Sequence, residues 1–205
     1  MKSQTDRPAR KVGRPLSFDR DGALEKAMYL FWQQGYEGTS ISELTEAMGI
    51  SPPSLYAAFG DKKQLFLAAI QRYMNSSESS PDAIRDAASA REAIETMLRT
   101  AAISHTQRGC PPGCLLISGA VNLSSASQDV RDEVVRIRSK VEKAVRDRLK
   151  RGIEEKELPP NTDAASLAAF YISITQGMSM QAQDGAKRER LFQIAENAMR
   201  AWPGK

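Results

Sequence analysis

Two short amphipathic segments, separated by only a few residues, constrain the fold of this chain more than any other feature. Ser40 followed three positions later by Glu43 matches a capping box, in which each side chain satisfies a backbone N–H at a helix start. Gly49 suits the left-handed conformation that ends a helix, and Ser51 before Pro52 suits the start of the next one. The sequence therefore predicts two short helices joined by a very tight turn.

Helices are also predicted on both sides of this pair. Apolar residues recur at three- and four-residue steps over residues 18–34, and Gly35 is the natural stop. Asp61 and Gln64 repeat the capping pattern and begin a fourth helix. Residues 75–82 read NSSESSPD, a polar stretch typical of a linker, so we place a domain edge there.

The rest of the chain also has helical periodicity, with no alternating strand pattern of useful length. Hydrophobic residues make up 41% and charged residues 26% of the chain, values typical of a soluble globular protein. We therefore predict an all-α fold, with an arm at 1–16, a helix-turn-helix domain at 17–75 and a helical domain at 83–205. The helices expected in the last domain cover residues 91–107, 113–123, 128–155, 162–183 and 187–201.

The excess positive charge of the chain lies entirely in its first sixteen residues. The net charge is +4; residues 1–16 hold five basic side chains against one acid, and the other 189 residues hold 24 of each sign. Three of the five, Arg10, Lys11 and Arg14, lie nearest the first helix. A thin Gly-Arg-Pro segment can lie in a DNA minor groove, where arginine senses the groove width, whereas a solubilising tail is the alternative. Beside a helix-turn-helix, we favour the arm as a DNA clamp.

A helix-turn-helix can place its second helix in the major groove of DNA while the first crosses the backbone. Helix N-termini carry unpaired N–H groups that bind phosphate, which makes Thr39, Ser40 and Ser51 candidate phosphate contacts. Tyr56 can add a hydroxyl and Lys62 a charge to the same backbone. Such contacts position a protein on DNA without reading its sequence.

Residues 17–74 closely resemble the DNA-binding domain of the tetracycline-repressor (TetR) family of transcriptional regulators. The likeness rests on FWQQGYEGTS at 31–40, MGIS at 48–51, LYAAF at 55–59 and DKKQLF at 61–66, in the family's order and spacing. The resemblance implies that Thr39, Ser40, Tyr56 and Lys62 contact phosphates. It also implies that the major groove is lined by residues 51–57, namely Ser51, Pro52, Pro53, Ser54, Tyr56 and Ala57.

The chain departs from the family pattern at this groove-lining helix. Where the family commonly has a basic residue or glycine followed later by histidines, this chain has Pro52, Pro53, Ala57 and Ala58. Few long donors are left to reach base edges. We therefore expect apolar contact with thymine methyl groups, together with the arm, to carry more of the specificity.

The resemblance further implies a homodimer formed by the helices at 162–183 and 187–201, packed as a four-helix bundle on a palindromic operator. Two-fold symmetry in the protein is mirrored in the two half-sites of the DNA. Independently, residues 164–174 are almost continuously apolar, and such a helix must be buried on most sides. The alternative is that this helix forms only the core of its own domain.

Members of the family usually release DNA when a small apolar or aromatic molecule enters a pocket among the carboxy-terminal helices. Apolar residues at helical spacing also suit plain core, and none of them identifies the effector. The candidates for the wall of such a pocket are Met97, Ile103, Leu116, Phe170, Met178 and Met180.

Cys110 and Cys114 occupy a short Pro/Gly turn, GCPPGC at 109–114, before a predicted helix. A helix start and Arg108 would favour thiolate, which supports the alternative function of a redox-responsive protein. A packed Cys114 is the other interpretation, because free cysteine is usually buried and GCLL at a helix start occurs in one branch of the family. With one histidine, His105, the two thiols do not complete a zinc site, so neither metal nor cofactor is expected.

No nucleophile with a neighbouring base is recognisable, so we expect no enzyme activity. No apolar run approaches the roughly 20 residues that cross a bilayer, and no apolar region follows the basic start as in a secretory signal. The expected location is the cytoplasm.

Overall fold

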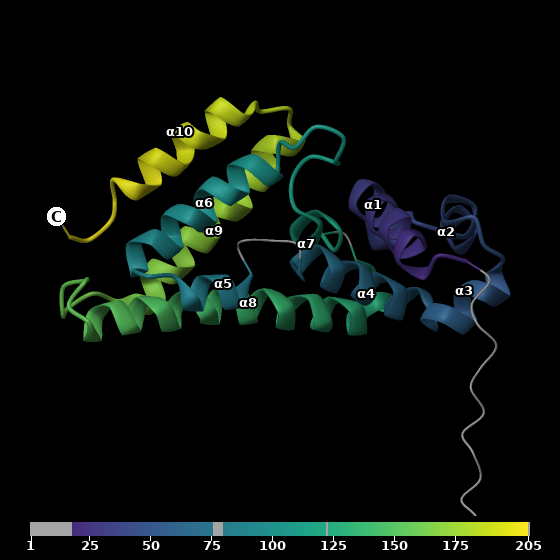
Figure 1. Cartoon of the computed structure of the whole chain (residues 1–205), viewed down its shortest axis with the longest axis horizontal. Coiled ribbons are helices and arrows are strands. Elements are labelled where there is room, and N and C mark those ends of the chain that lie inside the picture. Colours follow the sequence, from purple (N-terminus) through teal and green to yellow (C-terminus); the bar gives the residue numbers. More distant parts are fainter. Residues whose placement is uncertain (1–17, 76–79, 122, 205) are drawn as a thin grey trace, which may run out of the picture.

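The computed structural model describes residues 18–75, 80–121 and 123–204, and in this part of the chain every regular element is a helix. Figure 1 shows the long helix α8 running along one side, with the first four helices gathered at one end of the molecule and the carboxy-terminal end at the other. The predicted all-α fold is confirmed. In chain order the elements are α1 (Arg20–Gly38), α2 (Ile41–Met48), α3 (Pro52–Phe59), α4 (Lys62–Asn75), α5 (Pro81–Asp86), α6 (Ala90–Ser104), α7 (Leu115–Ser118), a 3₁₀ turn (Ser125–Ser127), α8 (Gln128–Glu154), α9 (Ala164–Gln183) and α10 (Arg188–Met199).

The predicted turn between α2 and α3 is confirmed in detail. The Glu43 N–H donates to Ser40 Oγ over 3.2 Å, and the Ser40 N–H donates to Glu43 Oε2 over 2.8 Å, which completes the capping box. Gly49 ends α2 with φ 70° and ψ 34°, a left-handed conformation that glycine adopts without steric cost. Ser51 caps α3 by accepting the Ser54 N–H at 3.3 Å, and a proline occupies the first turn.

A compact apolar core fixes the orientation of this helix pair. Leu44 of α2 and Leu55 of α3 are fully buried, together with Phe31 of α1 and Phe66 of α4. The Phe31 and Phe66 rings meet edge to face with their centroids 5.0 Å apart, a favoured aromatic geometry. The inward faces of α2 and α3 are therefore committed to packing, which leaves their other faces for contact with a partner.

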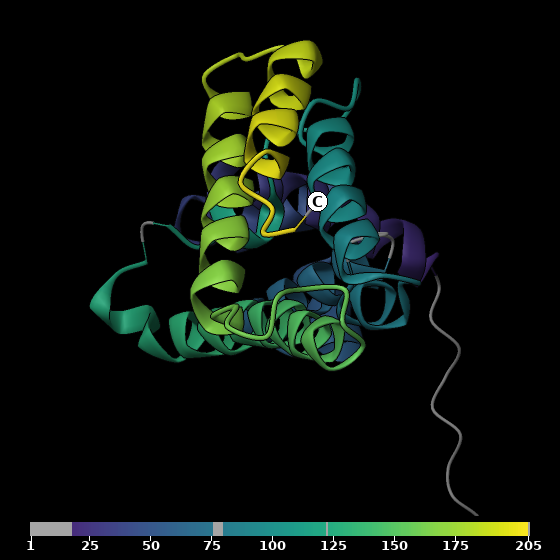
Figure 2. The same cartoon turned by 90° about the vertical axis from the view of Figure 1, so that its left-hand side faces the viewer.

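The second core lies among α5, α6, α8, α9 and α10. Figure 2 shows α9 and α10 running side by side, with α6 next to them and α8 beneath. Arg148 of α8 is a buried cation in this core, and its Nη2 donates to Glu157 Oε1 over 2.8 Å. This pairing supplies the opposite charge that a buried guanidinium requires.

The two cores are joined rather than separated. The first core includes Leu115 of α7 and Val130 and Val134 at the start of α8, so the helix-turn-helix packs directly on the carboxy-terminal helices. The domain limits at 17–75 and 83–205 stay a prediction, because this shared packing crosses them. Within the described residues, no helix combines the length and hydropathy that spanning a bilayer requires.

Three sequence expectations about elements need correction. The helix expected at 113–123 is only the four-residue α7, because the carbonyl of Gly119 turns to accept the Tyr36 N–H at 2.9 Å. The first helix breaks at Gly35, with φ 75°, but one further turn follows to Gly38. The expected linker contains the start of a short helix, α5, which Ser80 caps by accepting the Ala83 N–H.

Candidate DNA interface and ligand cavity

Helix α3 presents an exposed face of small and apolar side chains. Pro52, Pro53 and Ala57 are exposed on it, and Tyr56 is 51% exposed. The opposite residues, Leu55 and Phe59, are buried against the core as their spacing predicted. The exposed face therefore offers little hydrogen bonding beyond the Tyr56 hydroxyl and the two serines at its start.

Two serines stand at the helix starts next to this face. Ser40 and Ser51 are both exposed, and the hydroxyl of each accepts a backbone N–H of its own helix. Ser51 Oγ also lies 2.9 Å from the hydroxyl of the half-exposed Ser54. At the start of α2 the Ile41 and Ser42 N–H groups remain, where an anionic oxygen is favoured, whereas α3 begins with two prolines that have no N–H.

Thr39 differs from its neighbour Ser40. Its side chain is buried, and its hydroxyl donates to the carbonyl of Gly35 over 2.7 Å. The hydroxyl therefore closes the end of α1 instead of facing solvent. A phosphate contact from this side chain, expected from the sequence, does not fit the geometry.

Lys62 at the start of α4 is held against an aromatic ring. Its Nζ lies 4.4 Å from the centroid of the Tyr36 ring, a cation–π distance. Burial lowers the pKa of Lys62, while the charges of Glu37 and Glu43 act in the opposite direction. The ammonium group is thus positioned, half-buried, near the capped start of α2.

Arg20 also belongs to this surface, although no sequence motif pointed to it. Its Nη2 donates to the carbonyl of Ala58 over 3.5 Å, and its guanidinium carbon lies 4.7 Å from the centre of the Phe59 ring. These contacts tie the first turn of α1 to the end of α3. The arm residues Arg10, Lys11 and Arg14 lie outside the described residues.

The helix-turn-helix itself has no excess of positive charge. Residues 18–75 contain five basic and seven acidic side chains. Attraction to a polyanion therefore has to come from local contacts and from the arm, whose balance is +4.

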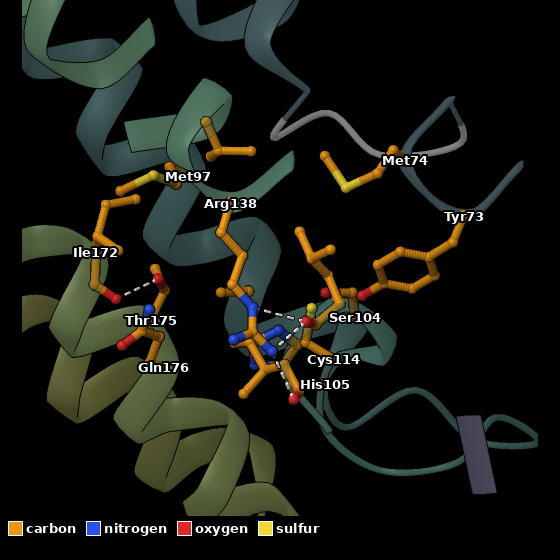
Figure 3. Close-up of a pocket in the computed structure, with 14 residues that line it drawn as sticks. Tyr73, Met74, Met97, Ser104, His105, Cys114, Arg138, Ile172, Thr175 and Gln176 are labelled. Carbon is orange, nitrogen blue, oxygen red and sulfur yellow. Dashed lines mark hydrogen bonds between the residues drawn. The ribbon is translucent and has the colours of Figure 1, made fainter. Parts of the chain in front are cut away.

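A cavity of about 110 Å³ opens where α4, α6, α7, α8 and α9 meet. Figure 3 shows Arg138 reaching from α8 towards His105 and Cys114, while Ile172, Thr175 and Gln176 of α9 form another wall. Tyr73 and Met74, at the end of α4, also line the space. The cavity is therefore bounded in part by the helix that directly follows α3.

Arg138 and His105 are the two ionisable nitrogen side chains that line this mainly apolar cavity. Arg138 Nε and Nη2 both donate to the carbonyl of Leu116, at 2.9 and 2.7 Å, and Nη2 also donates to that of Ile117 at 3.0 Å. His105 is only 5% exposed, and burial lowers its pKa to about 4, so its ring is neutral at pH 7. No sequence motif assigns either residue to this cavity, because both reach it only through tertiary packing.

Known protein families match both the part of the chain with the helix-turn-helix and the part with the cavity. The family profile described as "Bacterial regulatory proteins, tetR family" matches residues 23–69, and "Tetracyclin repressor-like, C-terminal domain" matches residues 90–199. The chain is 38% identical to the HTH-type transcriptional repressor ComR of Escherichia coli (strain K12), over 93% of this chain and 92% of that protein. This chain belongs to the TetR family of transcriptional regulators.

Another TetR relative, the HTH-type transcriptional repressor BdcR of the same strain, is 31% identical over 95% of this chain and 94% of its own length. Among solved structures, a cysteine mutant of the TetR regulator CifR in complex with 26-base-pair double-strand operator DNA superposes with a TM-score of 0.87. It is 43% identical and covers 93% of this chain and 100% of that one.

The residues expected to line a TetR effector pocket lie in different places. Met97 and Leu116 line the cavity, and Ile103 lines a separate groove between α1, α4 and α6. Met178 is fully buried in the second core. Phe170 and Met180 do not line the cavity, which corrects the expectation, because their side of α9 is open in this chain at 39% and 49% exposure.

The two cysteines are free thiols in the described structure. Burial raises the pKa of Cys114, against the smaller opposing effect of a hydrogen bond from the Tyr73 hydroxyl. The thiolate that the redox alternative requires at this helix start is therefore disfavoured, and the packed interpretation fits the Cys114 thiol. Cys110 Sγ lies 3.7 Å from the hydroxyl of Tyr29, a residue of α1. A redox-responsive function is not favoured for this TetR regulator.

Proposed function

We propose that this chain is a transcriptional repressor that binds a palindromic operator as a homodimer and leaves it when a small molecule binds. The observation that carries the proposal is the exposed face of α3 on a tightly capped helix-turn-helix. It is supported by similarity along more than nine-tenths of the chain to two repressors and to a regulator whose solved structure is complexed with operator DNA.

In this proposal α3 enters the major groove and the arm enters the adjacent minor groove. Pro52, Pro53 and Ala57 contact thymine methyl groups, since they have no side-chain donors for base edges. Ser40, Ser51, Tyr56 and Lys62 hold the phosphate backbone on either side. Arg20 ties the first turn of α1 to the end of α3, which supports an arrangement in which both α3 and the arm reach the same half-site.

The second copy of the chain packs on α9 and α10. One side of α9 carries Ala165, Ala169, Phe170, Gly177 and Met180, all exposed in a single chain. Small residues along a helix allow another helix to approach closely, and the two large side chains supply apolar area. The sequence of α9 is apolar nearly all round, yet this side is exposed in a single chain. A two-fold interface would bury it.

The position of the cavity supports release of the DNA on ligand binding. Tyr73 and Met74 belong to α4, and α4 packs on both α1 and α3. A molecule that fits the cavity only when α4 has shifted stabilises an arrangement in which the two α3 helices no longer match the operator. The cytoplasm, where the DNA is, is the corresponding location.

The test is selection of bound sequences from random duplex DNA by the purified protein at two salt concentrations, because phosphate contacts alone vary strongly with salt. The expected result is a palindrome whose half-sites are rich in thymine at the positions facing α3. Enrichment of a single, non-repeated half-site would contradict the dimer, and binding without any enrichment would contradict sequence-specific repression.

A further inference from the structure

Arg138 is a half-buried cation without an anionic partner. Within the described residues, no carboxylate lies within 4 Å of it, and its hydrogen bonds go to the Leu116 and Ile117 carbonyls through Nε and Nη2. Its third nitrogen, Nη1, makes no hydrogen bond to any residue that the structure describes. Burial lowers the pKa of the guanidinium, which still remains charged at neutral pH.

A second buried arginine on the same helix shows the contrast. Arg148 is also removed from water, but Glu157 lies 2.8 Å and Glu155 lies 3.7 Å from its guanidinium. Buried charges are normally paired in this way, because removing an ion from water without compensation is costly. The two carbonyls offer Arg138 only partial compensation, so the cavity keeps an unneutralised positive charge.

The other polar groups of the cavity suit an anion as well. No acidic side chain occurs among the described residues that line it. His105 Nδ1 is buried and without a hydrogen-bond partner in the described structure. Gln176 adds an amide, and the remaining surface includes Met97, Val141 and Ile172. The space thus combines one cation, neutral polar groups and apolar walls.

We propose that this cavity binds a small organic carboxylate, whose charged end pairs with Arg138 and whose apolar part lies against Met97, Val141 and Ile172. The inference rests on the proposed function and narrows its effector to an anionic class. The Leu116 and Ile117 carbonyls occupy Nε and Nη2, so Nη1 is the nitrogen that can donate a charge-assisted hydrogen bond to a carboxylate oxygen. At about 110 Å³ the cavity is smaller than an engineered cavity of roughly 150 Å³ that holds benzene, so the apolar part inside it is at most one ring or a short alkyl chain.

Calorimetric titration of the full chain tests the charge preference directly. The probes are benzoate, phenylacetate and hexanoate, each compared with its uncharged primary amide. At least one acid is expected to bind about tenfold more tightly than its amide, because a charge-assisted hydrogen bond is stronger than a neutral one. Equal binding of every acid and its amide, or no binding by any of the acids at millimolar concentration, would overturn the proposal.

Variants locate the charge. Arg138→Met is expected to weaken binding of the acid about tenfold and to leave the amide almost unchanged, whereas Arg138→Lys retains part of the preference. The matched control is Arg136→Met, an exposed arginine of the same helix that does not line the cavity. Undiminished acid binding in Arg138→Met would overturn the proposal. The acid–amide comparison uses the unaltered protein, so it decides the question even where this variant does not fold.

Operator binding separates this inference from the function on which it rests. A carboxylate that binds through Arg138 without releasing the selected operator would support the site and contradict ligand-controlled release. Release by the amides but not by the acids would support the regulator and overturn the anionic effector. Absence of sequence-specific DNA binding would contradict the proposed function, while the titrations still decide the ligand class.

Discussion

Glu37 links the helix-turn-helix to the segment that leads into α8. Its Oε1 accepts the Ser124 N–H at 2.9 Å and the Ser124 hydroxyl at 2.7 Å. The residue follows the break at Gly35, so the change of backbone direction there aims the carboxylate at this segment. One exposed side chain thus helps to set the angle between the two parts of the molecule.

This contact predicts a dependence of stability on acid. Hydrogen bonds from Ser127 and Ser124 lower the pKa of Glu37 from 4.5 to about 2. Because the folded state favours the carboxylate, its stabilising contribution is complete above pH 4.5 and is lost as the pH falls towards 2. Glu37→Gln is therefore expected to lose less free energy of unfolding than the unaltered chain between pH 5 and pH 3, measured by urea unfolding.

The control for this prediction is Glu46→Gln. Glu46 is an exposed glutamate of α2 whose side chain makes no hydrogen bond among the described residues. Its replacement should leave the acid sensitivity as it is. An identical pH dependence in Glu37→Gln and the unaltered chain would show that Glu37 does not contribute in this way.

Elements with complete local signals could be predicted from the sequence, and elements fixed by tertiary contacts could not. Ser40, Gly49 and Ser51 each specify a cap through their own side chain or backbone freedom, so α2 and α3 were predictable. The shortness of α7 depends on a hydrogen bond between Gly119 and Tyr36, which are far apart in the chain. The cavity is harder still, because its polar side chains come from separate helices with no common motif.

The arm is the element expected to contribute most of the attraction to phosphate. Deleting residues 1–16 should weaken operator binding and reduce the dependence of log K on log salt by roughly 2 to 3, corresponding to the loss of about three phosphate contacts. Fluorescence anisotropy of labelled operator over a salt series measures both quantities. Deleting only residues 1–6, which hold one lysine and one aspartate, is the matched control and should change neither. An unchanged salt dependence in the longer deletion would place the arm away from DNA.

Helix α9 is the element on which the dimer prediction depends. Phe170→Glu places a charge in the middle of the proposed interface, where desolvation without a partner is costly. The variant should sediment as a monomer and bind the palindrome at least about tenfold more weakly, because each half-site is then bound separately. Ser139→Glu, at an exposed position of α8, is the control and should remain dimeric. A dimeric Phe170→Glu protein would move the interface elsewhere.

The whole molecule is built so that a change at the cavity reaches the DNA-binding surface through packed helices. Met74 lines the cavity from the end of α4, and Lys63 at the other end of α4 pairs with Asp129 at the start of α8 over 2.7 Å. Both ends of α4 thus lie against the carboxy-terminal helices, and the length of α4 between these ends packs along α1. A shift of α4 relative to α8 has to be carried into the core that orients α3.

This arrangement predicts how ligand and operator affect one another. A compound that weakens operator binding by some factor must itself bind the operator complex more weakly by the same factor. Met74→Ala truncates one of the two α4 side chains that line the cavity, the other being Tyr73, so it should reduce that factor while both separate affinities persist. Gln71→Ala, one turn earlier on the exposed side of α4, is the matched control.

Titration of a releasing compound into free protein and into the operator complex, for the unaltered chain and both variants, measures the coupling in each direction. A coupling factor that is unchanged in Met74→Ala would mean that the signal does not pass through the end of α4. The remaining route would then be α7, which lines the same cavity and is followed by Gly119, whose carbonyl accepts the Tyr36 N–H beside the break in α1.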